Sequence, residues 1–301
     1  MTRISLIYNP SAGRQRGEIL AASLCQSLSR RGFDAQAYPT GGPNDGTTLA
    51  RNLASESDIV VAVGGDGTVN EVINGLAGSE TVLGIVPAGT VNVLALELGL
   101  MPCSVERACD LIAQGKTVCL DLGRANNRRF ALMLGAGIDA LTVRNLDLQA
   151  KRRFRELAFI ATGLAKGFAS KPPAFLLRSE GRECRATFAV AGNCRLYANR
   201  LSLTPRADPT DGLLDLLVFT GGSRAALAAF WLGTPSGLHL HHPQVTYFRS
   251  KHAELVPLPE PEPGRSSGQT QPVWFQTDGE LAGTLPVTVE IEPRALKVLV
   301  P

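Results

Sequence analysis

The sequence lacks the features that mark membrane-spanning or secreted proteins. Its 301 residues contain no apolar run near the ~18 residues that a membrane-spanning helix needs. The first residues lead directly into Ile4–Tyr8, an apolar stretch with the length of a strand and not of a signal peptide. We therefore expect a soluble, cytoplasmic protein without a transmembrane segment. Any contact with a membrane would be peripheral, at its inner surface.

The sequence also lacks a metal-binding cysteine pattern and a strong net charge. Its six cysteines include no C-x-x-C pair and no spacing typical of a metal site, so they are expected to be buried thiols in a reducing compartment. A net charge of +3 is too small to indicate nucleic acid, and no nucleic-acid partner is expected. The cysteines are Cys25, Cys103, Cys109, Cys119, Cys184 and Cys194.

Three common catalytic motifs are missing. No G-x-x-x-x-G-K-[ST] occurs, and the glycines at 65 and 67 do not continue into G-x-G-x-x-G, because position 70 is Asn. No G-x-S-x-G occurs either, so nothing supports the nucleophile of a serine hydrolase. These absences exclude the most common signatures of phosphate loops.

One stretch nevertheless has the composition of an anion-binding turn. Ile59–Val63 is a β-branched run that predicts a strand buried on both faces. It leads into the glycine-rich turn, Gly64–Thr68, where Gly64, Gly65 and Gly67 allow a tight turn and close approach of a ligand. Backbone N–H groups at such a turn bind anions. The sequence therefore predicts a phosphate site here.

An acidic residue in the middle of this turn indicates a cation. Asp66 would repel bare phosphate, so we expect a cation such as Mg²⁺ between the two. Thr68 or Asn70 is expected to cap the following helix, with Glu71 in its first turn.

Strands and helices alternate through the first 120 residues, which predicts a Rossmann-like parallel α/β sheet covered on both faces. Ligands bind beyond the carboxyl ends of the strands in such sheets, and four polar loops begin there, at Asn9, Thr40, Gly64 and Pro87. The expected strands are 4–8, 33–38, 59–63 and 82–86, and the expected helices are 17–30, 47–54, 70–76, 93–98 and 105–113.

The second half reads differently, as short β runs separated by turns, which predicts an antiparallel β-sandwich. We expect a nucleotide-binding α/β domain over residues 1–122, which residues 293–301 could complete, and a sandwich domain over 123–292. Residues 139–168 are expected to be largely helical, and 257–272 to form a surface loop. The expected strands are 117–122, 130–134, 174–178, 185–191, 200–204, 213–220, 244–249, 253–256, 273–277, 286–292 and 296–300.

Two acidic segments of the second half are ordinary turns by composition alone. The acidic turn, Asp208–Leu213, precedes a predicted strand and is rich in Asp and Gly. Asp278-Gly279 has the sequence of a tight hairpin turn and is followed by Glu280. Spacing by itself leaves open whether either turn has a function.

The polar loops together resemble the diacylglycerol kinase catalytic domain family, which includes sphingosine kinases and bacterial lipid kinases. NAD kinases and phosphofructokinases share only a shorter Gly-Gly-Asp-Gly. The family's acid after the fourth loop is replaced by Val93. The resemblance assigns nucleotide binding to Asn9, Pro10, Ser11, Ala12, Gly13, Thr40, Gly64, Gly65, Asp66, Gly67, Thr68, Asn70, Glu71, Gly89, Thr90 and Asn92.

The resemblance also implies the chemistry. It implies transfer of phosphate from ATP, with Mg²⁺, to a hydroxyl of diacylglycerol or a related lipid at a membrane surface. Glu280 matches the family's catalytic base and would deprotonate that hydroxyl. Asp121 matches an acid near the reacting groups, with Asp66 as the third catalytic residue. A structural Mg²⁺ would be held by Asp211 together with backbone oxygens at Asp208 and Leu213.

Two alternatives remain open at this stage: an NAD kinase-like phosphotransferase with a soluble substrate, and a catalytically silent nucleotide- or lipid-binding regulator.

The basic cluster Lys151–Arg155 is either a solvated helix face or a contact for anionic lipid headgroups. His239, His241 and His242 favour a surface turn over a metal site. The sequence determines neither which lipid is the substrate nor the oligomeric state. A homodimer is compatible with the sequence.

Overall fold

The computed structural model describes residues 1–11, 16–88, 92–138, 140–141, 173–198, 201–258 and 272–301. The predicted helix 139–168 and its basic cluster lie outside the described residues, apart from positions 140 and 141, as does most of the loop 257–272. Among the described residues, no helix is long and apolar enough to span a membrane.

The first half forms the predicted parallel sheet. Four strands pair in the order β2-β1-β3-β4, all parallel. Their apolar residues face two layers of helices, with α1 and α5 packed on one side and α2 and α3 on the other. The elements are β1 (Arg3–Tyr8), α1 (Arg16–Arg30), β2 (Asp34–Pro39), α2 (Asp45–Leu53), β3 (Ile59–Gly64), α3 (Asp66–Leu76), β4 (Val82–Pro87), α4 (Val93–Glu97) and α5 (Val105–Gln114).

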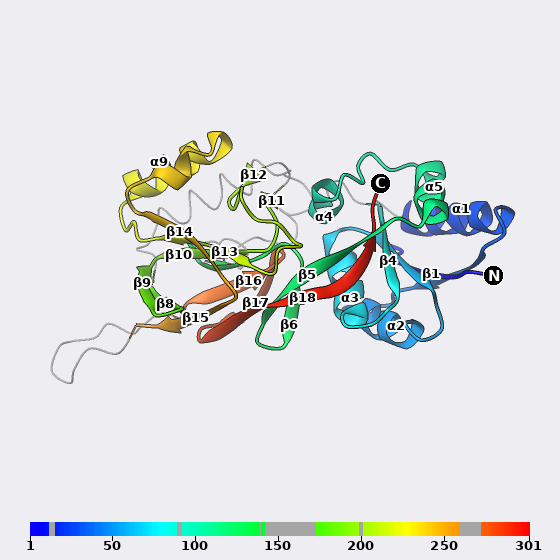
Figure 1. The fold of residues 1–301 in the computed structure, drawn as a ribbon, viewed down its shortest axis with the longest axis horizontal. Helices are drawn as coiled ribbons and strands as arrows, with labels where there is room; N and C mark the ends of the chain where they lie inside the picture. Colours follow the sequence, from blue (N-terminus) through cyan, green and yellow to red (C-terminus); the bar gives the residue numbers. More distant parts are fainter. Residues whose placement is uncertain (12–15, 89–91, 139, 142–172, 199–200, 259–271) are drawn as a thin grey trace.

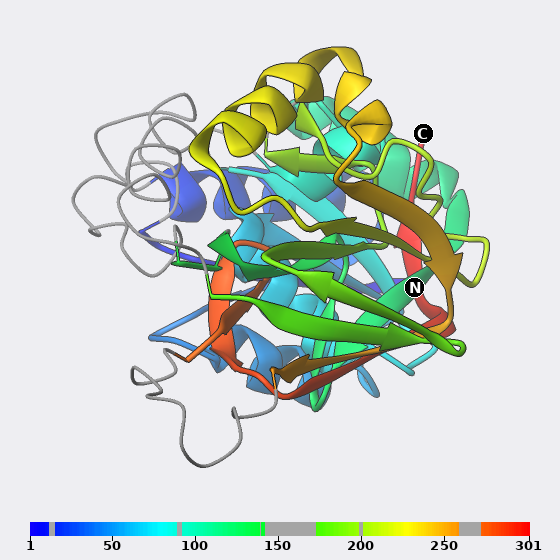
Figure 2. The ribbon, with the colours of Figure 1, turned by 90° about the vertical axis from the view of Figure 1, so that its left-hand side faces the viewer.

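The second half forms the predicted antiparallel sandwich (Figures 1 and 2). Six strands make the second sheet, in the order β14-β13-β10-β7-β16-β17. Facing it are antiparallel strands that continue the first sheet, and a shared apolar core lies between. The elements are β5 (Thr117–Ala125), β6 (Arg128–Phe130), β7 (Met133–Gly137), β8 (Phe175–Ser179), β9 (Arg182–Ala186), β10 (Phe188–Gly192), β11 (Leu196–Ala198), β12 (Leu201–Ser202), β13 (Leu214–Phe219), α9 (Arg224–Gly233), η1 (Thr234–Ser236), η2 (Leu238–His241), β14 (Val245–Ser250), β15 (His252–Pro257), β16 (Trp274–Thr277), β17 (Glu280–Thr284) and β18 (Val287–Leu299).

The long strand β18 joins the two halves into one ten-stranded sheet. It pairs antiparallel with β5 along most of its length, antiparallel with β15 near its start, and parallel with β4 where Val298 faces Leu83. Figure 1 shows it, in red, running from the sandwich into the parallel strands. The predicted α/β and sandwich architecture is thus confirmed, whereas the division at residue 122 stays a prediction, because it falls within β5.

Several predicted elements of the second half were wrong in extent. The run 185–191 is two strands, β9 and β10, and 130–134 is divided between β6 and β7. Conversely, 286–292 and 296–300 are one strand with a register shift between Glu292 and Leu296. No helix was expected over 224–233, where α9 packs the Phe230 ring 5.0 Å from Phe219 of the second sheet.

Two predictions about single residue types also need correction. His239 is 1% exposed and its Nε2 lies 3.1 Å from the Leu203 carbonyl oxygen, so it is a core residue, while His241 is exposed as a surface turn requires. All six cysteines are unpaired, but only Cys109 and Cys194 are buried.

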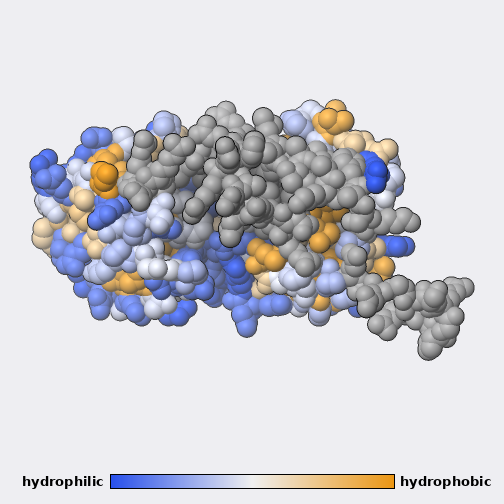
Figure 3. Space-filling view, turned by 180° about the vertical axis from the view of Figure 1, so that it is seen from behind, coloured by the Kyte–Doolittle hydropathy of each residue, from blue (hydrophilic) through white to orange (hydrophobic). Residues whose placement is uncertain are grey.

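The described part of the face in Figure 3 shows separate apolar spots among hydrophilic residues.

Candidate active site

The four polar loops meet at one edge of the first sheet. The carboxyl ends of β1, β2, β3 and β4 lie together, and backbone bonds connect the loops that follow them. The amide of Asn9 donates to Val63 O (3.3 Å), that of Thr40 to Tyr8 O (2.9 Å), and that of Ala88 to Gly64 O (3.0 Å). Of the predicted nucleotide ligands, Ala12, Gly13, Gly89 and Thr90 lie outside the described residues.

The first loop is shaped by its own side chain. Asn9 Oδ1 accepts a hydrogen bond of 2.9 Å from the Ser11 amide across Pro10, which is the geometry of an Asx turn. This bond sets the start of the loop at the carboxyl end of β1, beside Thr40. The structure therefore places Asn9, Pro10, Ser11 and Thr40 at the predicted edge, and their binding of nucleotide stays a prediction.

The helix after the glycine-rich turn begins earlier than expected. It starts at Asp66, its N-cap is Gly65, and no side chain caps it, so Thr68 and Asn70 are not caps and Glu71 is not in the first turn. A Cβ placed on Gly64 would lie 2.6 Å from Thr68, whereas one on Gly65 would meet no atom within 4 Å. Gly64 is thus required by packing, and Gly65 faces open space at an uncapped helix N-terminus, which suits an anion.

Asp66 lies where two helices begin. Its Oδ1 accepts a hydrogen bond of 2.8 Å from the amide of Val93, the first residue of α4, and Asp66 itself is the first residue of α3. Burial raises the pKa of this carboxyl to about 6, with a smaller contribution from the negative charge of Asp278. A cation at the site would remove that cost, so the position fits the predicted role of Asp66 toward Mg²⁺.

Three of the predicted nucleotide ligands bind other groups of the protein, two of them backbone amides and the third a carboxylate. Glu71 accepts from the amides of Asn44 (3.0 Å) and Gly46 (2.9 Å) at the start of α2. Asn92 Oδ1 caps α4 by accepting from the Ala95 amide (2.9 Å), with Asn92 fully buried. The third, Asn70, donates to Asp278. These contacts shape the loops, and direct binding of a nucleotide by these residues stays a prediction.

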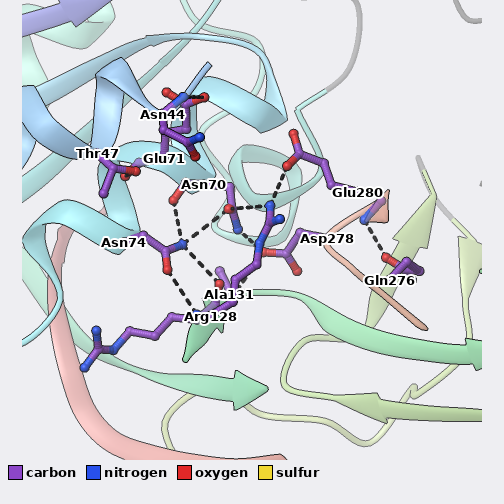
Figure 4. Close-up of polar contacts among 12 residues, drawn as sticks. Asn44, Thr47, Asn70, Glu71, Asn74, Arg128, Ala131, Gln276, Asp278 and Glu280 are labelled. Atoms are coloured by element: carbon purple, nitrogen blue, oxygen red, sulfur yellow. Dashed lines mark hydrogen bonds and ion pairs between the residues drawn. The ribbon is translucent and has the colours of Figure 1, made fainter. Parts of the chain in front are cut away.

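Glu280 comes from the other end of the chain and lies against the glycine-rich turn. It is the first residue of β17, and a Cβ on Gly67 would lie 3.1 Å from its Oε1. Its Oε2 forms an ion pair with Arg128 Nη2, drawn in Figure 4. The Glu280 side chain is 48% exposed, so a substrate can still reach the carboxylate.

The turn that carries Glu280 is a hairpin, as its sequence predicts. Asp278 and Gly279 both have positive φ, 49° and 81°, as the residues of a tight type I′ turn do. Asp278 is nevertheless more than a turn residue. Its carboxylate accepts from Asn70 Nδ2 (2.8 Å) and from the amides of Ala131, Leu132 and Met133 (2.8, 2.9 and 3.0 Å).

Asp121 lies with the acidic turn and not with Glu280. It is 1% exposed, and its carboxylate accepts from the amides of Gly212 (2.6 Å) and Arg294 (2.7 Å). Its own amide donates to Pro209 O at 2.7 Å. The structure thus gives Asp121 an anchoring position between β5, the acidic turn and β18, and its catalytic role stays a prediction without a supporting contact.

The acidic turn presents oxygen ligands of the kind that Mg²⁺ prefers. Within it, Asp208 Oδ1 accepts from the Thr210 amide and Asp211 Oδ1 from the Leu213 amide, both at 3.0 Å. Nearby, Asp215 Oδ2 is buried without a hydrogen-bond partner, and Arg249 lies 3.5 Å from the carboxylates of both Asp211 and Asp215. The donor set and the unpaired oxygen fit a cation. No group of three or more His, Cys, Asp or Glu side chains within the described ranges forms a metal cluster.

Sequence reasoning missed Arg128 as a site residue and gave Asp278 no role of its own. Arg128 is in β6 and contacts both Glu280 and, at 3.5 Å, Asn70 Oδ1. The Asn-Asn-Arg-Arg run at 126–129 carries a hairpin signal but nothing that indicates this distant partner. Only the tertiary fold brings these groups together.

Comparisons with known proteins match both halves of this chain. Residues 3–125 match the family model of the diacylglycerol kinase catalytic domain, and residues 133–300 match that of the YegS C-terminal NAD kinase beta sandwich-like domain. A diacylglycerol kinase of Mycobacterium tuberculosis is 31% identical over 99% of this chain and 95% of that protein. One of Bacillus subtilis is 26% identical over 95% and 92%.

A solved structure shares the fold. The crystal structure of a diacylglycerol kinase from Bacillus anthracis has a TM-score of 0.77 at 22% identity, covering 100% of this chain and 97% of that one.

Proposed function

Since this chain belongs to the bacterial diacylglycerol kinase catalytic-domain family and is a lipid kinase, we propose that it uses ATP and Mg²⁺ to phosphorylate a hydroxyl of diacylglycerol or a related lipid. The family assignment does not favour the NAD kinase-like or catalytically silent alternatives. The relatives named above are diacylglycerol kinases, which makes diacylglycerol the first acceptor to test.

The contact between Glu280 and the glycine-rich turn carries this proposal. A carboxylate that can accept a proton lies against Gly67, at the N-terminus of α3 where phosphate would bind. About two hundred residues separate them in sequence, so the fold itself brings Glu280 and the glycine-rich turn together. Phosphoryl transfer to a hydroxyl needs both groups at one place.

Each residue then has a definite task. Glu280 accepts the proton of the attacking lipid hydroxyl, and Arg128 holds its carboxylate toward the turn. Uncapped N–H groups at the start of α3 orient the phosphates, and Asp66 holds the cation. Mg²⁺–ATP, when bound, supplies the phosphoryl group and neutralises its charge. A second Mg²⁺ would be held structurally by the acidic turn through Asp208, Asp211 and Leu213.

The lipid substrate requires contact with a membrane surface. We expect peripheral binding, with cytoplasmic location, and Lys151–Arg155 remains a candidate contact for anionic headgroups, although it lies outside the described residues. Such binding should weaken with salt, because exposed charges are screened over about 10 Å at 0.1 M. Sedimentation with anionic and neutral vesicles at two salt concentrations measures it, and equal binding to neutral vesicles would contradict the electrostatic contact.

Glu280→Gln tests the proposed base directly. It keeps the shape and loses the proton acceptor, so kcat for transfer of the ATP γ-phosphate to diacylglycerol should fall by about 10²–10⁴-fold, with the KM for ATP nearly unchanged. Glu183→Gln is the matched control, because Glu183 is also half exposed and paired with an arginine, Arg178, at 2.8 Å. Retained kcat with a raised KM for ATP would place Glu280 in the nucleotide site instead.

A panel of acceptors tests the substrate class. Transfer of labelled γ-phosphate is measured to diacylglycerol, phosphatidylglycerol, a sphingoid base, undecaprenol and NAD. Labelling of a lipid that depends on Mg²⁺ and on Glu280 supports the proposal. Labelling of NAD alone, or of nothing, would overturn it.

A further inference from the structure

The hairpin turn beside the proposed base is held far more firmly than a hairpin requires. Type I′ turns are usually exposed loops satisfied by their own strands. Here the Asp278 carboxylate is enclosed by four N–H donors, three of them the consecutive backbone amides of Ala131–Met133, where β6 leads into β7. The Asp278 amide in turn donates to Met133 O at 3.0 Å. The turn is therefore bound to this segment by four hydrogen bonds.

The fourth donor on the carboxylate comes from the opposite half of the molecule. Asn70 is in α3, one helical turn after Asp66, and its Nδ2 donates to Asp278 Oδ2 at 2.8 Å. Asn74, one turn further, donates to Asn70 O at 2.9 Å and contacts Asn70 Oδ1 at 3.3 Å. This leaves the Asn70 NH₂ directed at Asp278, as Figure 4 shows. The carboxylate thus connects the helix of the phosphate site with the hairpin of the base.

All four partners are donors, so only an acceptor with two oxygens satisfies them. Asparagine would place an NH₂ group against the N–H of Asn70 and Ala131, and at least one donor would lose its partner. Asp and Asn both tolerate positive φ, so the turn conformation alone does not explain the carboxylate. The carboxylate is instead explained by the groups it joins.

We propose that Asp278 is a positioning residue, which fixes the Glu280 carboxylate against Gly67 by binding the hairpin to Asn70 of α3 and to the amides of Ala131–Met133. The inference rests on the proposed function of Glu280 as the base. Asp278 touches no substrate in this scheme. It acts through the two-residue spacing to Glu280, and a misplacement of about 1 Å at that carboxylate costs about 10²-fold in rate.

A double-mutant cycle tests the proposal. Asp278→Asn should lower kcat by about 10²-fold and leave the KM for ATP nearly unchanged. Combined with Glu280→Gln, it should lower kcat by no more than about threefold further, because a base that is already absent cannot be misplaced. Full additivity of the two losses would overturn the proposal.

Two further variants separate positioning from general loss of structure. Thr187→Val removes a buried hydroxyl between β9 and β10 that donates to Gly221 O at 2.8 Å, and should lower the melting temperature without changing kcat. If Asp278→Asn does not fold, Asn70→Ala removes one of the four donors and should show the same loss of kcat and the same non-additivity with Glu280→Gln. An unchanged kcat in a folded Asp278→Asn or Asn70→Ala protein would overturn the inference.

The outcome for Glu280 is distinguishable from the outcome for Asp278. If Glu280→Gln alone leaves kcat unchanged, Glu280 is not the base, and the double-mutant cycle no longer tests the role of Asp278. If Glu280→Gln lowers kcat but Asp278→Asn does not, the base stands and the positioning role of Asp278 fails.

Discussion

At the scale of single residues, the site keeps a carboxylate where burial opposes its charge. Burial raises the pKa of Asp66 to about 6, while an unfolded Asp titrates at about 4. The folded state therefore holds this proton to a higher pH than the unfolded chain does. The stability it contributes is present below about pH 4 and is lost as the pH rises through about 6.

Asp66→Asn should separate stability from activity. The amide oxygen can still accept from the Val93 amide, and no charge is buried, so in metal-free buffer the variant should melt above the wild type at pH 7 and close to it at pH 4. Kinase activity should be lost at both pH values. Thermal denaturation with EDTA between pH 4 and 7 measures the difference. A variant that melts below the wild type at pH 7 would contradict the burial argument.

A substitution of Glu71 tests whether this residue stabilises the start of α2 or binds the nucleotide. Its carboxylate satisfies two amides at the start of α2, so Glu71→Ala should lower the free energy of unfolding by about 1–2 kcal/mol in urea denaturation. Glu106→Ala, an exposed acid in the first turn of α5, is the control and should change it by less than about 0.5 kcal/mol. A raised KM for ATP with unchanged stability would instead show that Glu71 binds the nucleotide.

At the scale of elements, the acidic turn is connected to β5 and β18 through hydrogen bonds of the Asp121 carboxylate. If it binds Mg²⁺, the ion stabilises the folded state by about 2.7 kcal/mol at a concentration one hundred times the Kd. Asp211→Ala should abolish the rise in melting temperature that Mg²⁺ produces. Asp110→Ala, which removes a surface ion pair with Arg31, should leave that rise intact. A melting temperature insensitive to Mg²⁺ in the wild type would mean that the segment is only a turn.

Element by element, the sequence was most informative where a local rule decides the structure. The β-branched run at 59–63 is buried throughout, and Asp278-Gly279 forms the hairpin its composition indicates. α9 was missed because Arg224–Gly233 is apolar nearly all round and shows no amphipathic period. The start of α3 was misplaced because Gly65, and not Thr68, is its cap.

The contacts that define the site could not be read from local patterns. Asn70 and Asp278 are 208 residues apart, and neither has a neighbour in sequence that indicates the other. The Arg128–Glu280 pair is of the same kind. The resemblance to a known family predicted that Asp66 and Glu280 belong to one site. The hydrogen bonds and ion pair that hold them there follow from packing between the halves.

At the scale of the whole molecule, the ten-stranded sheet should make the two halves unfold together. Both tryptophans, Trp231 and Trp274, lie in the second half, whereas α1, α2, α3 and α5 lie in the first. Tryptophan fluorescence therefore reports on the second half, and helical circular dichroism mainly on the first. Because the halves share one sheet, the two signals should show coincident transitions in urea. Two separated transitions would show that β18 does not couple the halves.

Val298→Asp tests that coupling at one position. Val298 is 0% exposed and pairs with Leu83, so an unpaired charge there should cost more than about 4 kcal/mol and shift both transitions together. Lys297→Asp, at the neighbouring partly exposed position, should shift both transitions far less. A shift in only one of the two signals would contradict a shared sheet.

The path of β18 also has a consequence for how the chain is made. A ribosome delivers β1 to β4 early, but the strand that completes their edge beside β4 emerges about two hundred residues later. At roughly 5–20 residues per second, the nascent parallel sheet waits on the order of 10–40 s with that edge unpaired. An open strand edge is a template for pairing with other chains. Nascent chains stalled before β18 should therefore be the form of this kinase most dependent on chaperones, and the most prone to aggregate during synthesis.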